Sequence, residues 1–271
     1  MSIIVSVKIN DGIVMGADSA TMFFKPTGEA LQSYENANKI VNLVKGLPIG
    51  VMTCGSGGIG NASIDTLLKD LRAELSESGP HPLDSRNYTI EEITTRVRDF
   101  FDARAAAIDF KALLILRVGG YSSGRALPEL WHVGLNDGII YGPLSVQNEE
   151  EMGLRWNGEE EALTRLITGV SLGLGNAVVK EGVLTQEQIN EAMPKLYPYI
   201  SESLIMTAAP IQDAIDLARF MVETTKGFVR FSTNRQKTVG GAVEIAAITK
   251  HEGFKWVQRK HFYPYELNCS T

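Results

Sequence analysis

The fold is decided by residues 2–18, whose sequence is SIIVSVKINDGIVMGAD. Two runs rich in β-branched residues flank Asn10-Asp11-Gly12, so this stretch predicts a β-hairpin that starts at residue 2. A three-residue loop would pair Ile9 with Ile13 and leave the glycine available for a left-handed position. The first and last residues of the stretch would then share one face as diagonal neighbours, about 7–8 Å apart between backbones.

Ser2 is the candidate nucleophile because it follows the initiator methionine. Met1 is normally removed when the next residue is small, and removal would leave Ser2 with a free α-amine, whose ordinary pKa is about 7.7–8.0. Such an amine can act as a general base toward the hydroxyl of its own residue. The alternative is an ordinary start codon followed by a common residue, and Ser2 by itself does not decide between them.

The composition is that of a globular protein, and it argues against a membrane protein and a nucleic-acid-binding protein. The 271 residues are 44% hydrophobic and 21% charged, with no apolar run of membrane-spanning length. The start of the chain lacks a secretory signal pattern, so we expect a cytoplasmic protein. A formal net charge of −6 argues against a nucleic-acid partner. Two cysteines and four scattered histidines give no disulfide framework or metal spacing, so we expect no metal and no cofactor.

A glycine-rich turn follows the first strands. After a polar loop at residues 21–34, strands are predicted at 38–43 and 49–54, and Gly55–Gly60 then leads at once into a helix from residue 61. The turn matches G-x-G-x-x-G, but the dinucleotide-binding unit needs a parallel strand after the helix, and here a loop and a second helix follow. We therefore rank nucleotide binding below an oxyanion-stabilising turn.

The remaining elements indicate an α+β fold in a single domain, residues 1–271. A helix is predicted at 89–107, an antiparallel meander at 112–141, helices from 159 to about 168 and after Pro210, and strands at 241–248 and 254–257. Residues 173–205 read as an insertion with a helix near 185–193, and residues 261–271 read as a C-terminal extension. This order favours two packed antiparallel sheets between helix layers.

The first sixty residues resemble the mature proteasome β subunits and bacterial HslV. The resemblance rests on residues 2–19, on Asn38-Lys39-Ile40, and on residues 53–61. A start without a propeptide is similar to HslV and the bacterial proteasome homologues, including the ancestral β-subunit type. The resemblance implies the N-terminal-nucleophile (Ntn) hydrolase fold, a four-layer αββα sandwich, with peptidase activity inside stacked rings. It also implies peptide or unfolded-protein substrates, a homo-oligomer of two stacked rings and an ATPase unfoldase as a partner.

The same resemblance implies roles for five residues. Ser2 falls at the family's nucleophile, Asp18 at its hairpin acid and Lys39 at the lysine that tunes the nucleophile. Gly57 matches the glycine whose backbone N–H forms the oxyanion hole, and Asn157 replaces a serine that supports the terminal amine. An uncharged substrate pocket is expected near the turn, lined by Ala37, Gly55, Ile59 and Ser63.

Several positions depart from the family pattern and keep a second hypothesis open. Serine replaces threonine at the nucleophile, Asn157 cannot relay a proton as a hydroxyl can, and Gln236 and Val239 stand where an acid and a serine usually support the amine. Asn234 and Thr238 lie nearby in sequence. The leading hypothesis is an N-terminal serine peptidase or amidase in a ring, and the alternative is a catalytically silent ring or scaffold subunit.

Overall fold

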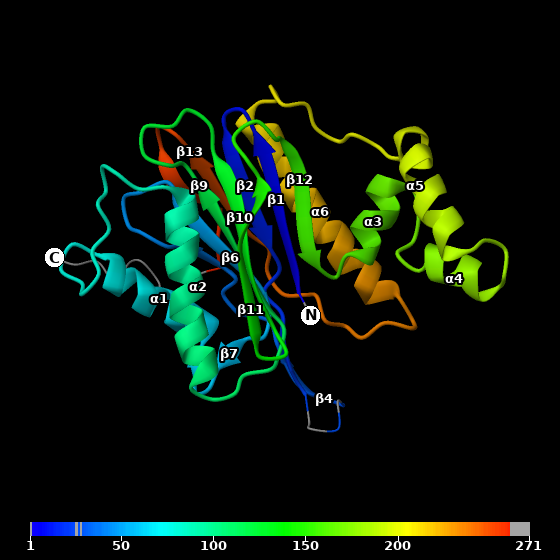
Figure 1. Ribbon diagram of the computed structural model, residues 1–271, viewed down its shortest axis with the longest axis horizontal. Helices are drawn as coiled ribbons and strands as arrows, with labels where there is room; N and C mark the ends of the chain where they lie inside the picture. The colour runs from blue at the N-terminus through cyan, green and yellow to red at the C-terminus, as the bar shows by residue number, and fades with distance from the viewer. Residues whose placement is uncertain (1, 25–26, 28, 261–271) are drawn as a thin grey trace.

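Two five-stranded antiparallel sheets form the centre of the protein (Figure 1). A computed structural model describes residues 2–24, 27 and 29–260. The first sheet has the order β12-β1-β2-β13-β14 and the second the order β11-β10-β9-β6-β5. In the first sheet the strands are β1 (Ile3–Ile9), β2 (Gly12–Ala17), β12 (Gly153–Gly158), β13 (Glu244–Thr249) and β14 (Gly253–Gln258). In the second they are β5 (Ile40–Asn42), β6 (Ile49–Gly55), β9 (Leu114–Gly120), β10 (Glu129–Asn136) and β11 (Ile139–Gln147).

Two small hairpins and six helices complete the described part of the chain, which is of the α+β class. The hairpins are β3 (Thr21–Phe24) with β4 (Ala30–Tyr34), and β7 (Gly58–Ile59) with β8 (Ala62–Ser63). The helices are α1 (Ile64–Leu75), α2 (Ile90–Ala106), α3 (Glu161–Thr168), α4 (Leu174–Lys180), α5 (Gln186–Ile200) and α6 (Ile211–Phe231). None of the helices in these described ranges combines the length and the apolar character needed to cross a bilayer.

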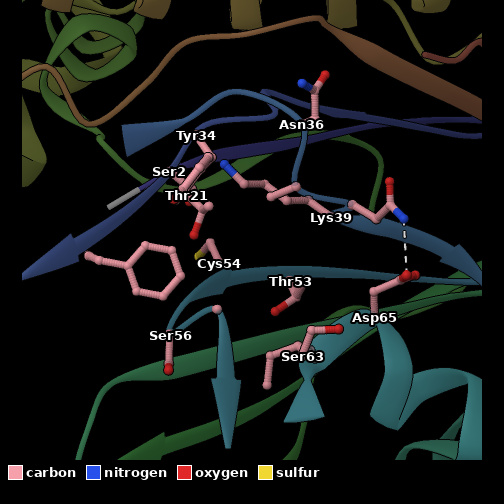
Figure 2. A pocket seen from close by; sticks show the side chains of 16 residues that line it. Ser2, Thr21, Tyr34, Asn36, Lys39, Thr53, Cys54, Ser56, Ser63 and Asp65 are labelled. Carbon is pink, nitrogen blue, oxygen red and sulfur yellow. Dashed lines mark hydrogen bonds between the residues drawn. The ribbon is translucent and has the colours of Figure 1, made fainter. Parts of the chain in front are cut away.

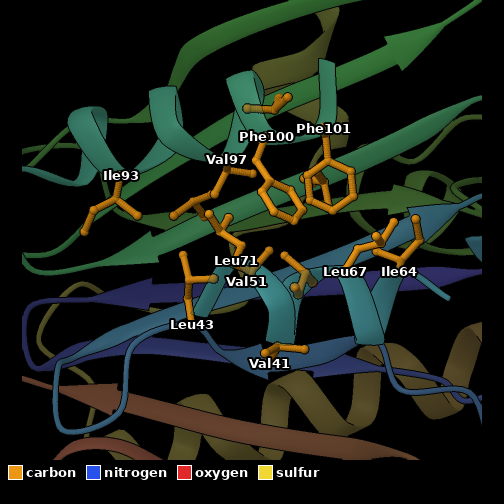
Figure 3. Close-up of a cluster of buried hydrophobic side chains, with 14 of the residues drawn as sticks. Val41, Leu43, Val51, Ile64, Leu67, Leu71, Ile93, Val97, Phe100 and Phe101 are labelled. Atoms are coloured by element: carbon orange, nitrogen blue, oxygen red, sulfur yellow. The ribbon is translucent and has the colours of Figure 1, made fainter. Parts of the chain in front are cut away.

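Three clusters of buried apolar side chains hold these elements together. In the first, Val41 and Val51 of the second sheet pack against Leu71 of α1 and Phe101 of α2 (Figure 3). The second cluster joins the Ile3, Val5, Val7, Ile9 face of β1 to α3 and α6. The third combines residues of both sheets, including Ile4 and Met15 from the first and Met52 and Leu130 from the second. Burial of these faces is the main favourable term in folding.

The β1–β2 hairpin forms as predicted, but its register differs from the predicted one. Ile9 pairs with Gly12 and Ile4 with Ala17, so the loop has two residues and Asp18 lies opposite Ile3 rather than on the face of Ser2. Gly12 does not adopt a positive φ. It is required instead by a close approach, because a Cβ there would lie 2.4 Å from the carbonyl oxygen of Ile248.

Three other predictions need correction. Residues 21–34 form a hairpin rather than a loop, and the rings of Phe23 and Tyr34 pack edge to face at 5.9 Å. Strand β12 escaped prediction because its partner β1 is about 150 positions away along the chain, so no local pattern marks the pairing. Helix α1 begins at Ile64 and not directly after Gly60, because β7 and β8 intervene and Ser63 caps the helix by accepting from Thr66 N–H.

The predicted insertion at residues 173–205 contains α4 and α5, which lie at one side of the molecule, away from the two sheets (Figure 1). Helix α4 buries none of its residues, and α5 buries only Ile189. A capping box at Thr185 and Gln188 begins α5, which runs to Ile200, beyond the predicted end. The predicted extension at residues 261–271, like Met1, lies outside the described residues.

Candidate active site

A cavity of about 480 Å³ opens where the start of β1, the β3–β4 hairpin, β6 and the start of α1 meet (Figure 2). Ser2, Lys39 and Gly57, three of the five predicted site residues, line it together. They come from distant parts of the chain and from both sheets. Ser2 and Lys39 therefore lie on the same side of the second sheet, as a shared site requires.

Asp18 and Lys39 form a buried ion pair behind this cavity. Lys39 Nζ lies 2.6 Å from Asp18 Oδ1, and the two side chains are 6% and 0% exposed. The carboxylate also accepts from the backbone N–H groups of Ile3 at 3.0 Å, Ala20 at 3.1 Å and Gly240 at 3.1 Å. Lys39 is thus a buried lysine paired with Asp18 and not a solvated surface lysine.

Burial and the charge of Asp18 act on the pKa of Lys39 in opposite directions. Desolvation lowers the pKa of its ammonium below the ordinary lysine value, and the charge of Asp18 opposes that shift. Within the described ranges, Lys39 makes no hydrogen bond with Ser2 Oγ; its hydrogen-bond partner is Asp18. The pair thus places a cation at the cavity wall and balances it with a carboxylate that the backbone holds in place.

Gly57 lies in the glycine turn, where a Cβ would come within 3.1 Å of Thr21 Oγ1. Gly55 has φ of +101°, and a Cβ at Gly55 would lie 2.3 Å from the carbonyl oxygen of Leu113. Gly57 accepts from Ile64 N–H at 3.0 Å through its carbonyl, and no hydrogen bond within the described residues uses its own N–H. The short β7–β8 hairpin separates the turn from α1, which removes the strand–turn–helix geometry of a dinucleotide fingerprint.

Asn157 does not line the cavity, and its side chain is engaged elsewhere. Its amide oxygen accepts from the buried guanidinium of Arg117, and its Nδ2 donates to Glu160 Oε1 at 3.3 Å. In the described structure the Asn157 side chain therefore forms a bridge between β12 and β9. Burial lowers the pKa of Arg117 to about 10.

The residues after Asn157 fix the backbone of Ser2 instead. Glu159 N–H donates to the carbonyl oxygen of Ser2 at 2.8 Å. Gly158 has φ of +107°, and a Cβ there would lie 1.8 Å from the same oxygen, so this position needs glycine.

The positions aligned with the family's amine-supporting acid and serine differ in exposure. Gln236 and Asn234 are exposed, whereas Val239 belongs to the buried cluster under α6. Thr238 is buried, and its hydroxyl has no hydrogen-bond partner in the described structure. Neither Gln236 nor Val239 supplies a buried polar group that could support an amine.

The predicted pocket residues are found in part. Ala37, Gly55 and Ser63 line the cavity, but Ile59 is buried in the core under α1. The prediction of an uncharged pocket is wrong, because Lys39 and Asp65 both line it.

Sequence reasoning missed further lining residues, among them Phe23, Tyr34, Thr53 and Cys54. Burial raises the pKa of the Cys54 thiol to about 12, so this thiol stays protonated at neutral pH and does not act as a thiolate nucleophile. No local motif marked these residues, since they come from β3, β4 and β6 and meet only at the cavity.

Comparisons with known proteins show the fold. No protein-family model matches the sequence, and no curated protein matches it. Among solved structures, "Anbu (ancestral beta-subunit) from Yersinia bercovieri" is similar at 13% identity over 98% of this chain and 89% of that chain, with a TM-score of 0.50. "Helical Assembly of the Anbu Complex from Pseudomonas aeruginosa" is similar at 12% identity over 96% of this chain and 88% of that chain, with a TM-score of 0.55.

These neighbours correct the family resemblance drawn from the first sixty residues. That resemblance pointed to proteasome β subunits and HslV, but the two solved structures described above are Anbu proteins, which are proteasome-like and form a distinct family. Neither a family model nor a curated protein supports an HslV-like assignment. At 12–13% identity the similarity establishes a shared fold and nothing about activity.

Proposed function

We propose that this protein is a proteasome-like N-terminal serine hydrolase that cleaves peptide or amide bonds after removal of Met1. Its sheets and helices would then make the four-layer αββα sandwich of Ntn hydrolases. The observation that carries the proposal is the cavity shared by Ser2, Lys39 and Gly57, with the Asp18–Lys39 ion pair buried beside it. Catalytic groups commonly combine burial, a charge partner and a concave site in this way.

The proposed chemistry assigns one step to each group. The free α-amine of Ser2 takes the proton from Ser2 Oγ as the oxygen attacks the substrate carbonyl carbon. The Lys39 ammonium stabilises the developing alkoxide and favours the neutral amine, while Asp18 holds Lys39 in place. The N–H of Gly57 donates to the tetrahedral oxyanion, a type of contact whose loss costs about 10²–10³ in kcat. The protonated amine then gives its proton to the leaving group, and water releases the acyl group from Oγ.

Peptide hydrolysis by variants at Ser2 tests the proposal. Ser2→Ala should abolish cleavage of fluorogenic peptides, and Ser2→Thr should retain it, because threonine keeps the hydroxyl and the α-amine. Ser6→Ala is the matched control, since Ser6 is on the same face of β1 and its hydroxyl donates to the carbonyl oxygen of Arg155 at 3.5 Å. Equal hydrolysis by the parent and Ser2→Ala would rule out Ser2 as the nucleophile.

A catalytically silent ring or scaffold subunit is the second candidate function. It is favoured by Asn157, whose amide is occupied by Arg117 and Glu160, and by the absence of a hydrogen bond between Lys39 and Ser2 Oγ in the described structure. A hydroxyl-directed electrophile separates the two candidates, because only an activated Ser2 should react with it.

We also propose that copies of this chain assemble into homo-oligomeric rings. In this proposal two such rings stack on each other and an ATPase unfoldase binds the stacked rings as a partner. Support comes from the Anbu fold and from the Pseudomonas aeruginosa structure, which is a helical assembly of the Anbu complex. Exposed apolar side chains on and after α5, including Tyr199 at 87% and Met206 at 81%, offer surfaces for contacts between copies. The mass of the assembly in solution tests this part of the proposal.

A further inference from the structure

A second buried ion pair lies close to the Asp18–Lys39 pair, and the proposed chemistry gives it no role. Lys260 Nζ lies 3.2 Å from Glu244 Oε2, and the two side chains are 7% and 1% exposed. Glu244 is in β13, opposite Ala17 of β2, so the second pair adjoins the strand that leads to Asp18. Because desolvation of two charges offsets much of their attraction, such a pair is weak evidence of added stability, and its other contacts show what it does.

The Lys260 ammonium connects segments that are far apart in the sequence. It donates to the carbonyl oxygen of Ala37 at 2.7 Å and to Ser19 Oγ at 3.2 Å. Ser19 is held by further bonds, because its carbonyl accepts from Ala37 N–H at 2.9 Å and its hydroxyl donates to the carbonyl oxygen of Ala242 at 2.6 Å. One cation thus joins the chain just after β14 to the segments that precede β3 and β5.

These contacts act on the wall of the candidate site. Ala37 and Lys39 both line the cavity, whereas Lys260 does not. The carbonyl that Lys260 holds belongs to the residue two positions before Lys39, and Ser19 directly follows Asp18. Lys260 therefore fixes both chain segments that carry the Asp18–Lys39 pair.

Lys260 also places a second positive charge near Lys39. Burial is the largest cause of the lowered pKa of Lys39, and the Lys260 ammonium adds to it because a like charge disfavours the protonated form. Asp18 opposes the shift. Cys54 faces Lys39 as well, but burial raises the pKa of its thiol to about 12, so it is neutral at neutral pH.

The surroundings of Lys260 keep it cationic. Burial lowers its pKa, and the charge of Glu244 opposes that shift. Arg259 and Asp65 have smaller effects, which oppose each other. If Glu244 were glutamine, the amide oxygen could still accept from the ammonium, as the Ala37 carbonyl does, so we expect Lys260 to stay charged.

We propose that Lys260 is a positioning residue of the site: its ammonium holds the two chain segments that carry Asp18 and Lys39 and keeps this pair at the cavity wall. The inference rests on the proposed function for its effect on peptide hydrolysis. Lys260 acts through backbone contacts and through its charge, and it does not touch the substrate. Its carboxylate partner in β13 supplies the counter-charge that allows the ammonium to be buried.

Variants that keep or remove the cation test the inference. Glu244→Gln keeps the Lys260 ammonium, whereas the double variant Glu244→Gln/Lys260→Met removes it without leaving a buried charge unpaired. The readout is the pKa of the Lys39 ammonium, followed by NMR of the full chain with isotopically labelled lysine and assigned by the loss of its signal in Lys39→Arg. Lys255→Met is the matched control, because Lys255 lies on β14 but is exposed.

The two variants should move the pKa of Lys39 differently. The double variant should raise it by roughly 0.5–1 unit, less than the 1–3 units that a directly contacting charge causes. Glu244→Gln should lower it or leave it unchanged, and Lys255→Met should leave it unchanged. A pair that only stabilised the fold would loosen in both variants, admit water and raise the pKa of Lys39 equally. An equal rise in both, or no rise in the double variant, overturns the inference.

Peptide hydrolysis provides a second readout and separates the inference from the proposed function. In the double variant kcat should fall about tenfold, because Lys39 is less well placed, while KM stays near the parent's, because Lys260 does not line the cavity. The alkaline limb of the kcat profile should move to higher pH, since Lys39 stays protonated to higher pH. The predicted pKa pattern in a parent that cleaves no peptide supports the inference, and the proposed function alone then fails. An unchanged kcat in the double variant of an active parent overturns the inference and leaves the hydrolase proposal intact.

Discussion

Removal of Lys39 is the sharpest test of how the site is built. Lys39→Met leaves the Asp18 carboxylate buried at 0% exposure without its cationic partner. Breaking a buried pair by removing one partner typically costs about 3–5 kcal/mol of unfolding free energy. Three backbone N–H groups, from Ile3, Ala20 and Gly240, still donate to the carboxylate, so we expect a loss of about 3 kcal/mol, at the lower end of that range.

Urea denaturation of the parent and the variant measures this loss. The matched control is Lys195→Met, because Lys195 and Glu191 are 71% and 75% exposed and pair at (i, i+4), where the contribution is below about 0.5 kcal/mol. The double variant Asp18→Asn/Lys39→Met should lose less than the sum of the two single losses, since each single change leaves a buried group unpaired. A loss below about 1 kcal/mol in Lys39→Met would refute the reasoning, because the pair would then behave as an exposed one.

Three further predictions follow from other parts of the structure. Gly158→Ala should displace Ser2 and abolish peptide hydrolysis, because the new Cβ would lie 1.8 Å from the Ser2 carbonyl oxygen. Gly182→Ala is the control and should keep the parent's activity, because there is open space around the new Cβ. Equal activity in both variants would contradict the close contact at Gly158. Burial lowers the pKa of His132 to about 4 from 6.5, so the unfolded chain binds the extra proton between these values and stability falls as pH drops through that window. His132→Gln should therefore lose less Tm than the parent between pH 6.5 and 4, and parallel Tm curves would oppose this. Tyr199→Ser, at a side chain 87% exposed, should lower the assembly mass measured by light scattering if α5 joins copies, and an unchanged mass would exclude that contact.

Local patterns in the sequence predicted much of the framework. Alternating β-branched residues predicted β1 and β2, and apolar residues at helical spacing predicted α2 and α6. The helix predicted from residue 89 begins there in the structure, where the Thr89 hydroxyl accepts from Glu92 N–H. The predicted register of the hairpin was wrong by one residue, because the loop length depends on which residues of the two strands pair next to the loop. Here that choice places Gly12 against the carbonyl oxygen of Ile248 in a distant strand.

The site could be predicted only in part, because contacts between residues far apart in the sequence also determine its lining. Ser2, Lys39 and Gly57 line one cavity, a grouping that only the family resemblance had implied. No local signal showed that Arg117 would reach across from β9 and occupy Asn157, or that the β3–β4 hairpin would bring Phe23 and Tyr34 to the cavity. Such contacts are fixed by packing between elements far apart in sequence, and only the folded structure shows them.

The most direct test of the central claim is the mass of the N-terminal peptide after exposure of the purified protein to an acylating β-lactone. We predict that tandem mass spectrometry finds a peptide that begins at Ser2, lacks Met1 and carries the acyl group on the Ser2 hydroxyl, and that Ser2→Ala carries no such adduct. An N-terminal peptide that retains Met1 and stays unmodified would contradict the account.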